Sequence, residues 1–114
     1  MRIERFAPQG NWNTLVAAAV SAEAAGFDSF AMPEIAHDPF IPLALASQRT
    51  SRIGLRTALA VAFPRSPMVT ANLAWDLHAE SGGRFTLGLG TQVQAHVERR
   101  FAATWTKPRS QLRE

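Results

Sequence analysis

Apolar residues alternate with polar or small residues in four short stretches, and helical spacing of apolar residues fills the segments between them. Alternation predicts strands, whereas apolar residues that recur every three or four positions predict amphipathic helices. The expected strands cover residues 2–6, 27–32, 52–61 and 85–88. The expected helices run from a cap at Asn11 or Asn13 to Ala25, over residues 42–47, and from a cap at Ser66, with Pro67 in the first turn, to Glu80.

Helical signals continue after the fourth strand. Thr91 and Gln94 fit a capping box, so a short helix is expected there, with Val97 and Phe101 on one face. A further helix is expected to begin at Pro108. In the helix that ends at Glu80, the inward face is expected to consist of Val69, Leu73, Ala74 and Leu77.

The order of elements is strand then helix, four times in succession. Such alternation predicts a parallel sheet with right-handed crossovers. A complete eight-stranded (β/α)₈ barrel needs about 250 residues, and this chain has 114. We therefore expect an α/β fold that forms the N-terminal half of a TIM barrel, as one partial domain over residues 1–114: a fragment, a truncated reading frame or a half-barrel that pairs. A doubly wound domain of the flavodoxin type is the structural alternative.

Composition narrows the function classes. The chain has no cysteine, which excludes disulfides and thiolate metal sites and fits a cytoplasmic protein. No apolar run reaches the length of a membrane span, about 18 residues, and the start does not read as a signal peptide. The net charge is +3, but the arginines are scattered, so we expect no nucleic-acid partner. No spacing of His, Asp and Glu suggests a metal site.

The most informative stretch is residues 81–91, which reads as a turn, a buried strand and a glycine-lined exit. Gly88 and Gly90 allow close approach to the backbone where the strand ends, which is where α/β proteins place ligands. Gly88, Gly90, Thr91 and Gln92 are therefore candidates for ligand contact, with packing and a helix cap as the alternative. The Rossmann fingerprint is not met, because position 93 is Val93.

Four segments together carry a family resemblance: residues 22–29, 50–57, 63–71 and 81–90. In this order they resemble the N-terminal half of the bacterial luciferase-like monooxygenases, especially the branch that depends on the deazaflavin coenzyme F420. The resemblance implies an oxidoreductase that transfers a hydride between F420 and a small organic substrate. An FMN-dependent monooxygenase on the same scaffold is the alternative.

The resemblance also implies where the cofactor ring lies. The ring would cross the carboxyl ends of the barrel strands, with a non-prolyl cis peptide bond behind it. In this chain that bond would join Ala58 and Leu59. Gly90, Thr91 and Gln92 would lie at the edge of the ring, and Gly88 would give it clearance.

Relatives place an acidic residue after the second strand, often followed by histidine. Here Glu34 takes the acidic position, Ile35 replaces the histidine, and His37 could substitute for it. Glu34 and His37 are therefore the catalytic candidates, since a histidine near a polar cofactor edge suits proton transfer. The alternative makes Glu34 a surface carboxylate and His37 a loop residue bonded to Asp38.

The expected partners follow from the half-barrel. Luciferase-like proteins bind the cofactor phosphate with loops late in the barrel, so we expect either a missing C-terminal half or a homo-oligomer. A non-catalytic half-barrel that self-associates through its exposed edge strands is the alternative from another class.

Overall fold

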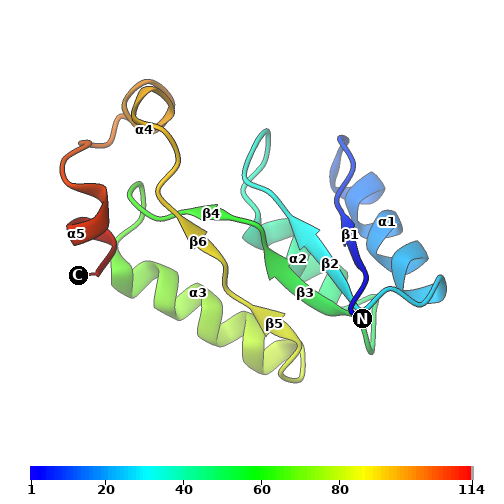
Figure 1. Ribbon diagram of the computed structural model, residues 1–114. Helices are drawn as coiled ribbons and strands as arrows, with labels where there is room; N and C mark the ends of the chain where they lie inside the picture. Colours follow the sequence, from blue (N-terminus) through cyan, green and yellow to red (C-terminus); the bar gives the residue numbers. More distant parts are fainter. Residues whose placement is uncertain (114) are drawn as a thin grey trace.

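A computed structural model describes residues 1–113. Its main sheet contains four parallel strands in chain order (Figure 1). These are β1 (Glu4–Phe6), β2 (Ser29–Met32), β3 (Gly54–Thr57) and β5 (Phe85–Thr86). A second parallel ladder joins β4 (Ala60–Val61) to β6 (Leu89–Gly90).

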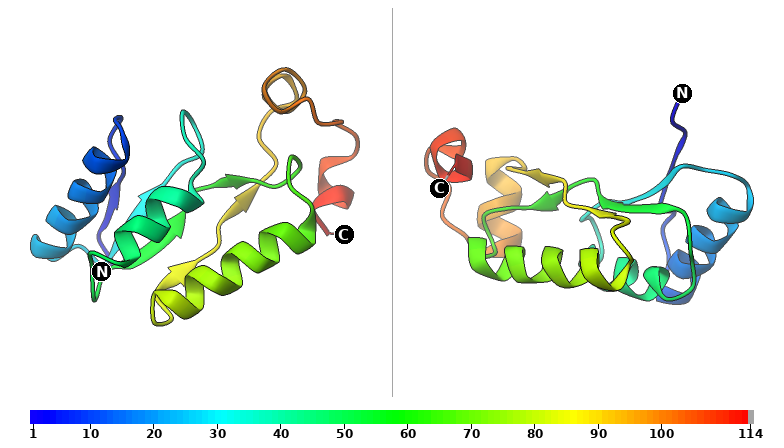
Figure 2. Two further views of the ribbon diagram at one scale, coloured as in Figure 1. Left: turned by 180° about the vertical axis from the view of Figure 1, so that it is seen from behind. Right: turned by 90° about the horizontal axis from the view of Figure 1, so that it is seen from below.

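Three helices follow the strands and lie side by side on one face of the sheet (Figure 2). They are α1 (Trp12–Ala24), α2 (Phe40–Ser47) and α3 (Pro67–Glu80). Two further helices, α4 (Gln94–Phe101) and α5 (Pro108–Arg113), lie beyond β6 (Figure 1). No helix within residues 1–113 combines the length and the apolar character that crossing a membrane requires.

The strand order identifies the architecture. Each strand pairs with the strand that precedes it in the main sheet, and β1 lies at the edge. A doubly wound sheet places its first strand inside the sheet and helices on both faces, so that alternative is wrong. The chain has the α/β fold of the first four β/α units of a TIM barrel, as the sequence predicted.

The core lies between the sheet and the three helices. Phe30, Leu55 and Phe85 occupy paired positions on neighbouring strands and are all buried. Leu15 of α1 and Leu43 of α2 pack against them, and the ring of Phe85 lies 6.3 Å from that of Phe40. The helix-facing positions of the strands are thus closed to solvent, which leaves the strand ends and the opposite face for ligands.

Two expected strands differ from those observed. Residues 52–61 divide into β3 and β4 at a cis peptide bond between Ala58 and Leu59. The strand expected over residues 85–88 ends at Thr86, and β6 lies beyond its expected end. At the break, the Thr57 hydroxyl donates to the Gly88 carbonyl and accepts the Gly88 N–H, both at 2.8 Å. There the Thr57 hydroxyl makes the hydrogen bonds that backbone groups make elsewhere in the sheet. The alternation of residue types does not predict such a change.

The helix starts agree with the sequence in two cases. Asn11 caps α1, because its side chain accepts the Thr14 N–H at 3.0 Å, and Ser66 caps α3. The helix expected over residues 42–47 begins earlier, at Phe40, whose N–H donates to Asp38.

Two details of the expected helices are wrong. The capping box at Thr91 does not form: the Thr91 hydroxyl donates to the Gln92 carbonyl, and α4 begins after Val93 without a side-chain cap. Val69 does not face inward in α3, where its exposed fraction is 50%, whereas Leu77 is buried.

Two charged side chains, Arg84 and Glu23, form hydrogen bonds with the backbone of the loops at the amino ends of the strands. Arg84 donates to the Thr50 hydroxyl and to four carbonyl groups, those of Ser47, Thr50, Ile53 and Ser81. Glu23 accepts the N–H groups of Ser51, Arg52 and Ile53. Backbone hydrogen bonds from Ile53 and Arg52 lower the pKa of Glu23 below its ordinary value.

Candidate active site at the carboxyl ends of the strands

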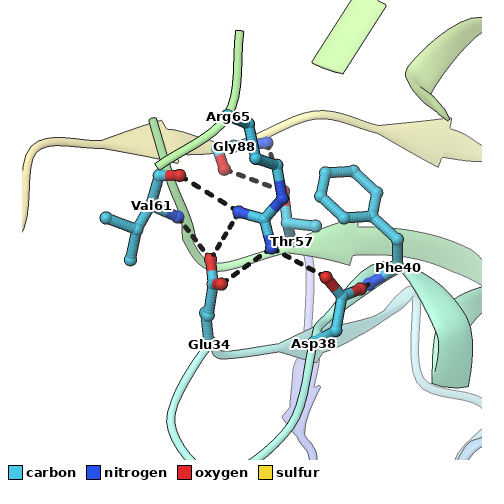
Figure 3. Close-up of polar contacts among 7 residues, drawn as sticks. All are labelled: Glu34, Asp38, Phe40, Thr57, Val61, Arg65 and Gly88. Atoms are coloured by element: carbon cyan, nitrogen blue, oxygen red, sulfur yellow. Dashed lines mark hydrogen bonds and ion pairs between the residues drawn. The ribbon is translucent and has the colours of Figure 1, made fainter. Parts of the chain in front are cut away.

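An ion pair joins two loops at the carboxyl ends of the strands, the end of the sheet that we call the rim (Figure 3). Glu34 follows β2, and Arg65 precedes α3. Arg65 Nη2 lies 2.7 Å from Glu34 Oε1, and Nη1 lies 3.0 Å from Oε2. This two-point contact is the geometry in which a guanidinium holds a carboxylate most firmly.

The same ion pair holds the backbone of β4. The Val61 N–H donates to Glu34 Oε2 at 2.6 Å, and Arg65 Nη1 donates to the Val61 carbonyl at 3.1 Å. Arg65 Nη2 also donates to Asp38 Oδ2 at 2.7 Å, and the guanidinium lies 5.2 Å from the centre of the Phe40 ring. We call Glu34, Asp38, Val61 and Arg65 the rim network.

The electrostatics of the rim network follow from its contacts. The hydrogen bond to Glu34, and then that to Asp38, raise the pKa of Arg65, against an opposing effect of burial. The raised pKa favours the charged form of Arg65. Two carboxylates share that cation, and the Phe40 ring lies beside it.

The structure decides between some of the alternatives for the catalytic candidates. Glu34 is no surface carboxylate, because only 5% of it is exposed. His37 does not bond to Asp38: its Nε2 lies 2.7 Å from the carbonyl oxygen of Gly10, in the loop after β1. The catalytic roles of Glu34 and His37 stay predictions.

The cis peptide bond between Ala58 and Leu59 is present where the resemblance implied it. Next to it, Leu59 lies against Gly90, and a Cβ atom at Gly90 would overlap the Leu59 side chain. A Cβ atom at Gly88 would overlap the carbonyl oxygen of Thr57. Gly88 is therefore required by the packing of the backbone itself, whereas a side chain at Gly90 would require the Leu59 side chain to move. The contact of both glycines with a ring stays a prediction.

Thr91 and Gln92 follow β6 and are half-buried. Gln92 has a φ of 58°, a left-handed conformation that side chains other than glycine rarely adopt. Its Oε1 accepts the N–H of Val93 at 3.2 Å, which leaves the amide nitrogen of the side chain as a donor. The two residues thus offer a hydroxyl and an amide at the rim.

Most of the candidates lie together. Ala58, Leu59, Gly88 and Gly90 meet where β4 pairs with β6, and the Glu34 N–H donates to the Leu59 carbonyl at 3.3 Å. His37 lies apart from them, in contact with the loop after β1. Sequence reasoning missed Thr57, Val61 and Arg65 as parts of this arrangement. Arg65 belongs to a segment that carried the resemblance, but nothing in the order of residues showed its partners.

The rim suits a flat, largely apolar group. Partly exposed apolar side chains follow the strands at this end: Ile35, Leu59, Leu89 and Val93. The two glycines keep Cβ atoms away from the bend, and Thr91 and Gln92 add a neutral hydroxyl and amide beside the charged rim network. Residues 1–113 contain no cluster of three or more His, Asp or Glu side chains that could hold a metal ion. Apolar side chains with a hydroxyl and an amide beside them fit an organic ring cofactor.

Relatives of known sequence cover most of this chain. Rv1360, an uncharacterized protein of Mycobacterium tuberculosis, is 52% identical over 97 residues, which are 85% of this chain and 28% of that protein. Rv3520c of the same organism, provisionally named as a coenzyme F420-dependent oxidoreductase, is 37% identical over 108 residues, or 94% of this chain and 30% of that protein. The chain thus spans less than a third of the length of these relatives.

Solved structures share the fold. The F420-dependent tetrahydromethanopterin reductase of Methanopyrus kandleri matches with a TM-score of 0.76 and 25% identity, over 88% of this chain and 29% of that chain. The oxygenating constituent of 3,6-diketocamphane monooxygenase from Pseudomonas putida, in complex with FMN, matches with a TM-score of 0.76 and 20% identity, over 89% and 32%.

A comparison with a model of a whole protein family agrees with these individual similarities. The model of the luciferase-like monooxygenase family matches residues 2–114. With the parallel four-unit fold and the bent strand pair at its rim, this match establishes that the chain belongs to the luciferase-like monooxygenase family.

Proposed function

We propose that this chain provides the cofactor-facing rim of an oxidoreductase that exchanges a hydride between coenzyme F420 and a small organic substrate. The bend in β3–β4 and β5–β6 carries the proposal, because it gathers Ala58, Leu59, Gly88 and Gly90 at the carboxyl ends of the strands. The 37% identity to Rv3520c supports the deazaflavin as the cofactor.

The residues of the chain would hold and shield the cofactor. Ala58 and Leu59 would support one face of the ring, and the Thr91 hydroxyl and the Gln92 amide would bind its polar edge. Leu59, which lies against Gly90, would also exclude water from that face. When bound, the deazaflavin supplies the hydride chemistry, and the protein supplies orientation and a dry surface.

FMN is the alternative cofactor. The same fold holds FMN in the Pseudomonas monooxygenase, and an apolar rim with neutral edge donors would accept either ring. A luciferase-like monooxygenase would then be the function of the whole protein.

The completed barrel would need further chain. Within residues 1–113, β1 and β5 each pair on one side only, and the sheet face opposite the helices has no covering layer. We assign that cover to four further β/α units, from the same polypeptide or from a second copy of this chain.

Cofactor titration tests the proposal. F420 and FMN would each be added to the protein, and binding would be followed by the change in cofactor absorbance. We expect tighter binding of F420; tighter binding of FMN would overturn the choice of cofactor, and binding of neither would overturn the function.

A matched pair of variants locates the site. Leu59 lies at the rim with an exposed fraction of 38%, and Val20 lies on α1 with 39%. Leu59→Asp should weaken cofactor binding at least about tenfold, since it places a charge against the ring. Val20→Asp should leave the affinity unchanged, because it adds the same charge away from the rim.

A further inference from the structure

Arg65 contacts more separate elements than the other rim side chains described above. Its guanidinium bonds to Glu34 after β2, to Asp38 before α2 and to Val61 at the end of β4. Only 14% of the side chain is exposed. A half-buried cation with this many partners restricts the relative positions of the segments that it joins.

The contacts continue from Val61 to the residues proposed to face the cofactor. Both backbone groups of Val61 are bound by the rim network, the N–H by Glu34 and the carbonyl by Arg65. The adjoining Ala62 N–H donates to the Gly90 carbonyl at 3.0 Å. Movement of Val61 would therefore move Gly90, and with it Leu59, which lies against that glycine.

Glu34 has a defined part in this arrangement. Its Oε1 accepts Arg65, and its Oε2 accepts both Arg65 and the Val61 N–H. A carboxylate that is buried and engaged at both oxygens serves as an acceptor for these donors. Its contribution to the site is geometric, and proton transfer to a substrate would require that the ion pair first break.

We propose that Arg65 is a positioning residue of the cofactor site, which it shapes through Glu34 and Val61. This inference rests on the proposed function, because it concerns the residues that would face the ring. It also assigns Glu34 to the support of the site in place of proton donation.

A matched control lies at the other end of the strands. Arg84 is also a partly buried arginine with several hydrogen bonds, but its partners are the end of α2 and the loops at the amino ends of the strands. Arg65→Met and Arg84→Met should both lower the free energy of unfolding. Only Arg65→Met should weaken cofactor binding, by about tenfold or more, measured where both variants are fully folded.

Lysine variants keep the test decisive if a methionine variant does not fold. Arg65→Lys retains the charge but loses the two-point contact with Glu34. It should weaken cofactor binding by less than Arg65→Met, and Arg84→Lys should leave binding unchanged. Cofactor affinity in Arg65→Met or Arg65→Lys equal to that of the unmodified protein would overturn the inference.

Amide hydrogen exchange tests the network without any cofactor. In Arg65→Met or Arg65→Lys, the Val61 and Ala62 amides should exchange at least about tenfold faster, because Arg65 holds both Glu34, the acceptor of the Val61 N–H, and the Val61 carbonyl, next to Ala62. In the Arg84 variants these two amides should exchange at the original rate. Unchanged exchange in the Arg65 variants would overturn the inference even if the unmodified chain binds neither cofactor, an outcome that would separately refute the proposed function.

The Glu34 variant separates support from proton donation. Glu34→Gln keeps the shape of the side chain but removes its charge and its ability to titrate. If Glu34 supports the site, this variant should resemble Arg65→Lys in its exchange rates and cofactor affinity. Original affinity together with original exchange at Val61 would count against the assignment.

Discussion

The carboxylate of Glu23 accepts the backbone N–H of Ile53 at 2.8 Å and so joins the end of α1 to the segment that enters β3. The N–H groups of Ser51 and Arg52 bond to the same carboxylate. The three successive N–H groups resemble a backbone nest that binds an anion, but here the anion is a side chain of the protein itself. Its charge is the reason that the folded chain should respond to acid.

Acid should weaken the fold through Glu23. The pKa of Glu23 is lowered from 4.5 in the folded chain, so its stabilising contribution is complete above pH 4.5 and is lost as the pH falls through the lowered pKa. Glu23→Gln should cost about 1 kcal/mol or less at neutral pH, because solvent screens the charge of this accessible carboxylate, and its difference from the unmodified protein should shrink below pH 4.5. Urea unfolding at several pH values measures this, with Glu98→Gln on the exposed face of α4 as the control.

The cap of α1 distinguishes two asparagines. Asn11→Ala should lower the free energy of unfolding by about 1 kcal/mol, because the N–H of Thr14 loses its acceptor. Asn13→Ala should be neutral or slightly stabilising, since Asn13 lies inside the exposed first turn of the helix, where alanine is the better helix former. Thermal unfolding followed by circular dichroism would compare the two, and equal effects would contradict the cap at Asn11.

Gly88 should tolerate no side chain. Gly88→Ala would place its Cβ atom on the Thr57 carbonyl oxygen, which is backbone and cannot move aside, so a loss of about 3 kcal/mol or more is expected. Gly26→Ala is the control, because Gly26 has a φ of +84° but no atom within 4 Å of the added Cβ. That change should cost about 1 kcal/mol, the penalty of the left-handed backbone alone.

Gln92 should show opposite effects on stability and on binding. Its left-handed backbone favours glycine, so Gln92→Gly should raise the free energy of unfolding by up to about 1 kcal/mol. The same change removes the amide proposed to bind the ring edge and should weaken cofactor binding.

Ala102 provides the comparison for Gln92. It ends α4 with a φ of 50°, so Ala102→Gly should give a similar gain in stability without any change in affinity. Calorimetric unfolding and cofactor titration of both variants would test the pair. Equal affinities in the two variants would argue against a contact between Gln92 and the cofactor.

The periodic features of the sequence predicted the order of elements and their fold. Local signals were sufficient there, because Asn11 and Ser66 satisfy backbone groups of their own helices and alternating strands form buried faces. The same reasoning failed at Thr91, whose hydroxyl had another acceptor close by in the Gln92 carbonyl. A short polar motif does not determine which of two nearby groups its side chain will bond.

The site was predicted in part. The resemblance implied the position of the cis peptide bond and drew attention to Glu34, whereas the pairing of Glu34 with Arg65 joins residues 31 positions apart. The separate ladder of β4 and β6 was missed for the same reason. It depends on Thr57 bonding to Gly88, a contact that exists only once two distant strands lie beside each other.

The division of the strands into two ladders has a consequence for how such a molecule can change over generations. The main sheet and α1–α3 contain the hydrophobic core, whereas the β4–β6 ladder is held by side-chain contacts from Thr57, Glu34 and Arg65. Substitutions in the β4–β6 ladder can therefore change the surface that faces a ring or a substrate without altering the hydrophobic core of the main sheet. Related proteins that share this main sheet could thereby diverge in the reactions that they catalyse.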